Sequence, residues 1–157
     1  MLVGEGDCEV AFLKHLKSVY APRNCGVSVT VHNAHGKCPE HIVNVTYRFS
    51  NNKAFDCKAA LLDTDIEKKP TTIKKAQRFK IVLIDSNPCI EGLLLNMLGE
   101  HVPATTRECK ARISRLIDED LKDTVTYQIF TKEDLEQIRT RIPEIDELIR
   151  LLQGEKI

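Results

Sequence analysis

The sequence predicts an α/β fold in which about four strands form a parallel sheet flanked by helices, with a helical C-terminal extension. Apolar residues switch repeatedly between strand-like alternation and the helix-like period of about 3.6 residues. Carboxylates follow the candidate strands, where open parallel sheets place their ligands. A hydrophobic fraction of 42% and a charged fraction of 29% over 157 residues are typical of an ordinary globular domain.

The N-terminal segment predicts a short strand followed by a helix. Met1 to Gly4 is only a stub of strand, which leaves open whether the native start lies upstream. Asp7 is a suitable N-cap for a helix that continues to about Tyr20. The apolar residues that predict the buried face of this helix are Val10, Phe12, Leu13 and Leu16.

The next segment predicts a second strand and helix. Val27 to Val31 alternates valine with serine and threonine, which is a strong strand signal. A polar loop from His32 to Pro39 follows, and a helix begins near Pro39 and continues toward Phe49.

Two further strands are predicted with a short helix between them. Phe55 to Leu62 ends in an apolar run, which is typical of a central strand buried on both faces. Thr71 to Gln77 predicts the short helix, and Lys80 to Ile84 predicts the fourth strand.

A helix from Cys89 to Leu98 is expected after the fourth strand. Asn87 is the predicted cap, Pro88 suits the first turn, and Gly99 ends the helix. Residues 1–100 would form the core of the domain, and residues 101–157 are predicted to be mostly helical and to pack on it.

The segments expected in this C-terminal part are a helix from Thr105 to Leu121, a helix capped by Thr131 with Asp134, and a helix beginning at Pro143. The residues from Val125 to Phe130 fit either an edge strand or an extended connection. The Thr105 to Leu121 helix would bury its apolar side, which holds Cys109, Ile113, Leu116 and Ile117.

Composition excludes several classes of protein. The six cysteines contain no C-x-x-C pair, so they predict free thiols in a reducing cytoplasm rather than a zinc or disulfide site. No apolar run approaches the roughly 18–20 residues that span a membrane, and the acidic N-terminal region does not resemble a signal peptide. The formal net charge is zero, so any nucleic-acid binding would depend on local basic patches.

The first carboxylate motif is the turn after the first strand. Glu5 stands between Gly4 and Gly6, whose glycines permit a tight turn and the close approach of a phosphate. Glu5 is therefore expected to project into a cleft. Glu9 lies in the following helix, where it either joins the same site or simply stabilises the helix N-terminus.

Two further motifs follow the third and fourth strands. Asp63 and Asp65 are two residues apart, so an extended backbone points both carboxylates the same way, and Mg²⁺ suits such a pair. A solvated turn would explain the same Asp-x-Asp motif. Glu91 is placed to reach the same cleft, although an acidic residue in a first helical turn also has a purely structural explanation.

A basic run follows the Asp-x-Asp motif directly. It either forms a solvated face or guides a nucleic-acid backbone toward the site. Its predicted nucleic-acid-binding residues are Lys68, Lys69, Lys74, Lys75 and Arg78. Three histidines lie in the loop and helix that follow the second predicted strand, and their spacing matches no zinc-binding pattern: His32, His35 and His41.

The order and spacing of these motifs resemble the Toprim superfamily, and within it the RloB-like and OLD-like nucleases. The shared pattern is Glu5-Gly6 with Glu9 four residues after Glu5, followed by Asp63 and Asp65 after a later strand. RloB-like proteins are also similar at two segments, Asn33-Ala34-His35-Gly36-Lys37 with Pro39, and Ser86-Asn87-Pro88-Cys89-Ile90-Glu91 with its apolar continuation. The resemblance covers roughly residues 1–100.

The resemblance implies a Toprim-like fold and Mg²⁺-dependent hydrolysis of phosphodiester bonds in DNA or RNA, with Mn²⁺ as a substitute. Glu5 would act as general acid/base, and Asp63, Asp65 and Glu9 would bind the metal. Glu5 and Glu91 are further predicted ligands of the same metal. Lys37 is the cation expected to stabilise the transition state. The sequence leaves open whether an ATPase or another protein subunit is a partner that switches the activity on.

Two other functions remain open from the sequence. One is a non-catalytic Toprim-like module that binds nucleic acid or a protein through its helical C-terminal third. The other is a Mg²⁺-dependent phosphohydrolase of small molecules, since strand-end aspartates also occur on such folds. The glycine-flanked Glu5 argues against the second, because those enzymes usually rely on aspartate.

Overall fold

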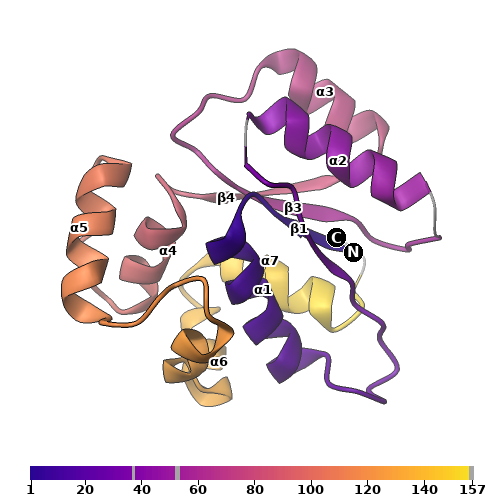
Figure 1. Cartoon of the computed structure of the whole chain (residues 1–157). Helices are drawn as coiled ribbons and strands as arrows, with labels where there is room; N and C mark the ends of the chain where they lie inside the picture. The colour runs from indigo at the N-terminus through magenta and orange to yellow at the C-terminus, as the bar shows by residue number, and fades with distance from the viewer. Residues whose placement is uncertain (37, 52–53, 156–157) are drawn as a thin grey trace.

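The structure, a computed structural model, describes residues 1–36, 38–51 and 54–155. Strands and helices alternate in the first half, and helices alone make up the second half (Figure 1). The strands are β1 (Leu2–Gly4), β2 (Val31–Asn33), β3 (Ala59–Asp63) and β4 (Val82–Ser86). The helices are α1 (Asp7–Tyr20), α2 (Pro39–Asn51), α3 (Pro70–Arg78), α4 (Ile90–Met97), α5 (Thr106–Leu116), the 3-10 helix η1 (Thr124–Ile129), α6 (Lys132–Ile138) and α7 (Pro143–Leu152).

The four strands form one parallel sheet in the order β2-β1-β3-β4, so the predicted fold class is confirmed. Leu2 of β1 pairs with Val31 on one side and with Ala59 on the other. Because every strand points the same way, the residues after their carboxyl ends meet at one edge of the sheet.

Helices cover both faces of the sheet (Figure 1). On one face, α2 and α3 bury a smaller core around Val3, Ala60 and Leu62. On the other, α1, α4 and α7 pack over a larger core that includes Leu2, Leu61 and the α7 residues. Alternate residues of β3 enter opposite cores, which explains why its Ala-Ala-Leu-Leu run is apolar throughout.

Strand ends differ from the predictions because pairing partners, not local composition, set them. The predicted strand from Val27 to Val31 is paired only from Val31, since the register places the earlier residues beyond the end of β1. The strand predicted from Phe55 begins at Ala59. The fourth strand runs from Val82 to Ser86, two residues later than predicted, because its register follows β3 through Asp63.

Helix starts were predicted less well than helix bodies. Asp7 is not the cap of α1: Gly6 holds the N-cap position, and Asp7 is the first helical residue. Asn87 does not cap α4 and Pro88 is not in its first turn, because α4 begins at Ile90 with Cys89 at the N-cap position. The Thr131–Asp134 capping box of α6 is confirmed.

The C-terminal third is helical, with two corrections. The helix predicted to reach Leu121 ends at Leu116, whose side chain is exposed rather than buried. The segment from Val125 to Phe130 is neither a strand nor an extended connection, because η1 occupies most of it and buries Tyr127 against α1. The six cysteines are free thiols, as predicted. None of the described helices has the length and apolar character to cross a membrane.

Candidate active site at the carboxyl edge of the sheet

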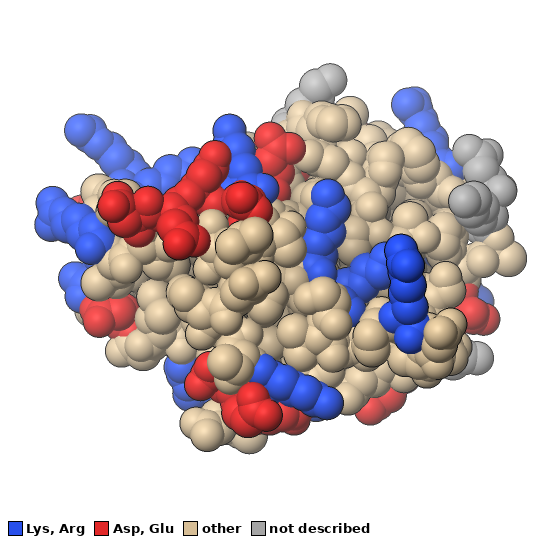
Figure 2. Space-filling model, turned by 60° about the horizontal axis from the view of Figure 1, so that its bottom comes forward, with Lys and Arg blue, Asp and Glu red and all other residues tan. Residues whose placement is uncertain are grey.

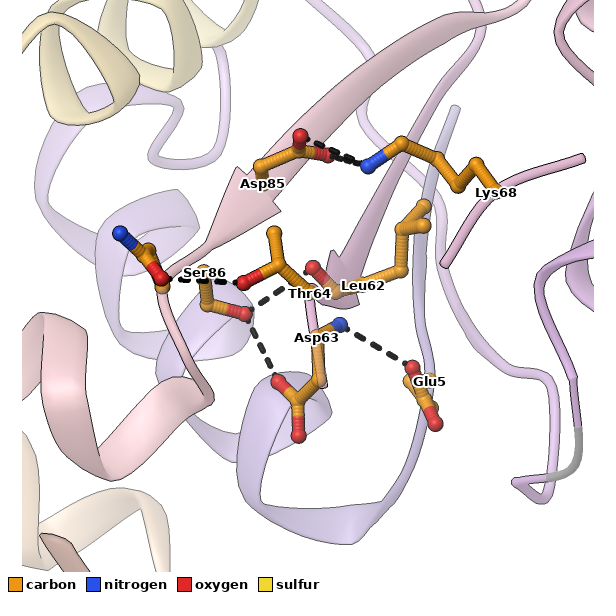
Figure 3. A network of polar contacts seen from close by, with 8 residues as sticks. Glu5, Leu62, Asp63, Thr64, Lys68, Asp85 and Ser86 are labelled. Atoms are coloured by element: carbon orange, nitrogen blue, oxygen red, sulfur yellow. Dashed lines mark hydrogen bonds and ion pairs between the residues drawn. The ribbon is translucent and has the colours of Figure 1, made fainter. Parts of the chain in front are cut away.

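Glu5 is the first residue after β1, and its position depends on Gly4. A Cβ at Gly4 would lie 2.9 Å from both Glu9 Cβ and Val10 N, so the start of α1 can approach the strand end only over a glycine. Asp63 N donates a hydrogen bond of 3.1 Å to Glu5 Oε2 (Figure 3). The bond ties the Glu5 carboxylate to the end of the neighbouring strand β3.

Glu9 lies in the first turn of α1 and is only 5% exposed. Gly6 N donates a hydrogen bond of 2.7 Å to Glu9 Oε2. The carboxylate therefore caps its own helix, as the structural explanation of this residue predicts. Its burial beside Gly4 also places it against the turn that carries Glu5.

Asp63 joins three elements at the centre of this edge (Figure 3). It is the last residue of β3, and its Oδ1 accepts hydrogen bonds from Ser86 Oγ of β4 at 2.8 Å and from Ile90 N of α4 at 3.0 Å. Ile90 N is one of the amide groups that a helix start leaves without an internal partner. Asp63 therefore supplies the cap that sequence reasoning assigned to Asn87.

Asp65 and Glu91 lie on either side of this centre. Asp65 is exposed, and Thr106 Oγ1 of α5 donates a hydrogen bond of 3.1 Å to its Oδ2. Glu91, in the first turn of α4, is only 6% exposed, and its Oε2 has no hydrogen-bond partner among the described residues. A buried carboxylate oxygen without a partner is uncommon and marks a place where a ligand would be stabilising.

The carboxylates influence one another's protonation. Burial, followed by the neighbouring charges of Glu9, Glu5 and Asp65, raises the pKa of Asp63 to about 7, and the Ser86 hydroxyl opposes this rise. Burial also raises the pKa of Glu5, with contributions from Glu9 and Asp65. It raises the pKa of Glu9 too, where Glu91 adds to the shift and Lys110 opposes it. Such mutual repulsion indicates that these side chains share one region.

Among the side chains that the structure describes, no basic group neutralises these carboxylates directly. Within residues 1–36, 38–51 and 54–155, none of the five carboxylates forms an ion pair. Across the same residues, no group of three or more histidine, cysteine, aspartate or glutamate side chains is arranged to hold a metal ion. The site is thus a set of close, acidic and partly buried carboxylates rather than a closed metal cage.

The loop after β2 lies beside Glu5. Gly36 N donates to Glu5 O at 2.7 Å, and Asn33 Nδ2 donates to Asp7 Oδ1 at 2.7 Å. Residues 33–36 are therefore next to Glu5 and Asp7. Lys37, the predicted catalytic cation, lies outside the described residues.

The predicted basic run divides into paired and unpaired side chains. Lys68 Nζ contacts both carboxylate oxygens of Asp85 at 2.6 and 2.7 Å (Figure 3), and Lys75 pairs with Glu40 at 3.5 Å. These two ion pairs reduce the positive charge that the run offers to a polyanion. The exposed members without an ion pair among the described residues are Lys69, Lys74 and Arg78.

Two residues near the site were given no role of their own by the sequence reasoning. Ser86 is fully buried and bonds to Asp63, although in the sequence it is only an ordinary residue before a predicted cap. Lys110 of α5 acts electrostatically on Glu9, yet more than 100 residues separate the two. Only a contact between distant segments reveals either role.

Comparison of the chain with protein-family models, with curated proteins and with solved structures gives no match. The Toprim resemblance therefore stays a prediction from the motifs, and the roles of the site residues are proposals.

Proposed function

We propose that the carboxyl edge of the sheet is a Mg²⁺-dependent phosphodiesterase site of the Toprim type, acting on DNA or RNA. The observation that carries this proposal is the meeting of Glu5, Glu9 and Asp63, with raised pKa values and no ion-pair partner among the described residues. Close carboxylates of this kind need either a proton or a cation to relieve their repulsion.

The donor chemistry of the site suits Mg²⁺. This ion takes oxygen ligands, keeps several waters, and is commonly held by one or two carboxylates together with substrate phosphates. Asp63 and Asp65 would hold it, with Glu9 and the unpartnered Oε2 of Glu91 behind them. Because a site of one or two carboxylates suffices, Mg²⁺ binding does not require the closed group of ligands that the described residues lack.

Side-chain and main-chain groups of the protein would transfer the proton and orient the metal ligands. Glu5 Oε2 is held by Asp63 N, which leaves Oε1 as the atom that takes up or releases a proton. A pKa raised by burial moves this carboxyl toward neutral pH, where a general acid/base is most effective. Ser86 and Ile90 N fix Asp63 in orientation. A bound Mg²⁺ would polarise the phosphoryl oxygens and lower the pKa of an attacking water.

A non-catalytic module that binds nucleic acid or a protein is the second candidate. It is favoured by the capping bonds that already use Glu9 and Asp63, because these bonds give both carboxylates a structural purpose. The two candidates differ in whether binding is followed by cleavage.

The deciding experiment is cleavage of labelled single- and double-stranded DNA and RNA with Mg²⁺ or Mn²⁺. Glu5→Gln and Asp65→Asn are expected to abolish cutting, whereas Glu133→Gln, an exposed carboxylate change on α6, should leave it unchanged. Cutting that survives both site substitutions would contradict the assignment. Metal-independent binding without cutting would support the non-catalytic module.

A further inference from the structure

Phe49, near the end of α2, is the most exposed aromatic side chain among the described residues. It is 45% exposed, whereas the other seven phenylalanine and tyrosine side chains, all of them described, are buried or half-buried. Its ring packs against the ring of His32 of β2, with the two centroids 3.6 Å apart. Because β2 is an edge strand, this aromatic pair of Phe49 and His32 lies at the edge of the sheet.

The strand register places the aromatic pair close to the carboxylates. His32 pairs with Val3 of the neighbouring strand β1, and Glu5 follows Val3 by two positions. At a rise of about 3.3 Å per strand residue, Glu5 is one strand across from His32 and roughly 7 Å further along. One short oligonucleotide can therefore contact both the aromatic pair and Glu5.

The helices beside the aromatic pair are basic. Helices α2 and α3 lie side by side (Figure 1), and together they carry four lysine and arginine residues but a single acid, Glu40, which is paired with Lys75. This excess is local, because the net charge of the whole chain is zero. The exposed cations of these helices and their flanks that form no ion pair among the described residues are Arg48, Lys69, Lys74, Arg78 and Lys80.

A single-stranded nucleic acid has the two chemical features that match this surface. Its phosphates are attracted to lysine and arginine, and its unpaired bases stack on aromatic rings. A duplex offers the same phosphates, but its bases are already paired and stacked on one another. A protein partner is disfavoured, because the cores of protein interfaces are depleted of charged residues.

We propose that Phe49, supported by His32, stacks an unpaired nucleobase while the cations of α2 and α3 hold the phosphates on either side of that base. This inference rests on the proposed function and deepens it, since it makes single-stranded DNA or RNA the substrate of the carboxylate site. The stacked base would then fix which phosphodiester bond lies beside Glu5.

The test measures binding by fluorescence anisotropy without added metal, so it does not depend on cleavage. Four labelled oligomers of about ten nucleotides are compared: single-stranded DNA, single-stranded RNA, an abasic strand with the same phosphates, and a duplex. Phe49→Ala should weaken binding of the single strands about tenfold and leave binding of the abasic strand and the duplex unchanged. The tighter of the two single strands identifies the sugar of the substrate.

Two further substitutions separate stacking from general apolar contact. Phe49→Leu keeps an apolar side chain without a ring, so it should weaken single-strand binding as much as Phe49→Ala does. Ile129→Ala removes an exposed apolar side chain from η1, away from α2 and α3, and should leave all four affinities unchanged.

Phe49→Trp gives a direct optical signal of stacking, because the protein contains no tryptophan of its own. Single strands should quench the indole fluorescence, whereas the abasic strand should bind without quenching. This variant keeps an aromatic ring at position 49, so single-strand affinity should be retained.

Three results would overturn the proposal: no binding of single strands by the unchanged protein, an equal loss of abasic-strand binding in Phe49→Ala, or no quenching in Phe49→Trp. Failure of the proposed enzymatic function gives a different result. A protein that shows the expected binding and quenching but cuts no strand with Mg²⁺ would support the stacking site and contradict cleavage.

Discussion

Asp63 shows how one residue serves structure and proposed function together. Its Oδ1 fixes β4 and the start of α4, and the neighbouring charges of Glu9, Glu5 and Asp65 surround it. Burying a carboxylate among like charges destabilises its ionised form. The nearby negative charges that destabilise ionised Asp63 in the folded protein are the same charges that would attract a cation.

The pH dependence of stability follows from this residue. The pKa of Asp63 rises from 3.8 to about 7 on folding, so the folded state binds a proton that the unfolded state has lost. Without metal, the free energy of unfolding should therefore fall as pH rises from about 4 to about 7, by roughly 1–2 kcal/mol from this group after solvent screening. Urea denaturation at a series of pH values measures this change in the free energy of unfolding.

Asp63→Asn is the matched variant, because an amide oxygen can still accept the bonds from Ser86 and Ile90. Its stability should decrease less between pH 5 and pH 8 than that of the unchanged protein. An identical pH dependence of the two proteins would show that Asp63 is not the group that titrates.

At the scale of elements, local signals predicted helices better than strands. The spans of α1, α2, α3 and α7 follow from apolar periodicity and from end signals such as Pro70, Pro143 and Gly154. Strand ends follow the neighbouring strand, as in β4, whose register with β3 carries it to Ser86. The start of α4 could not be predicted locally, because its capping oxygen belongs to Asp63, 27 residues earlier.

Helix α4 offers a test of close packing at the site. A Cβ at Gly92 would lie 2.6 Å from Asn87 O and 2.7 Å from Pro88 Cδ. Helix propensity alone would make Gly92→Ala stabilising, but the clash should instead lower the free energy of unfolding by about 1–3 kcal/mol. Asn96→Ala, at an exposed position of the same helix, is the control for propensity. A more stable Gly92→Ala protein would show that the turn before α4 adapts easily.

Over the whole sequence, 23 lysine and arginine residues balance 23 aspartate and glutamate residues. On the face shown in Figure 2, basic and acidic side chains are interspersed, in keeping with a formal net charge of zero. The sequence placed the candidate carboxylates after strands that now prove to be parallel neighbours. It could not foresee the ion pairs of Lys68 and Lys75, because their partners come from other segments.

Nucleic-acid binding should therefore depend on the three exposed members of the basic run. Replacing Lys69, Lys74 and Arg78 by glutamate should weaken binding and reduce its salt dependence, because fewer phosphate contacts release fewer counterions. The control exchanges three lysines elsewhere for glutamate, Lys14, Lys58 and Lys132. Fluorescence anisotropy at several salt concentrations compares the nucleic-acid affinities of the two triple variants. Equal loss of affinity in both triple variants would indicate only a general effect of net charge.

The most direct test of the central claim is calorimetric titration of the protein with Mg²⁺ at pH 8, where Asp63 is mostly ionised. We predict saturable binding that is lost in the Asp63→Asn/Asp65→Asn double variant and kept in Glu40→Gln. Binding should weaken as pH falls below about 7, because protons compete for the same carboxylates. No saturable binding, or binding unchanged in the double variant, would contradict a magnesium site at this edge of the sheet.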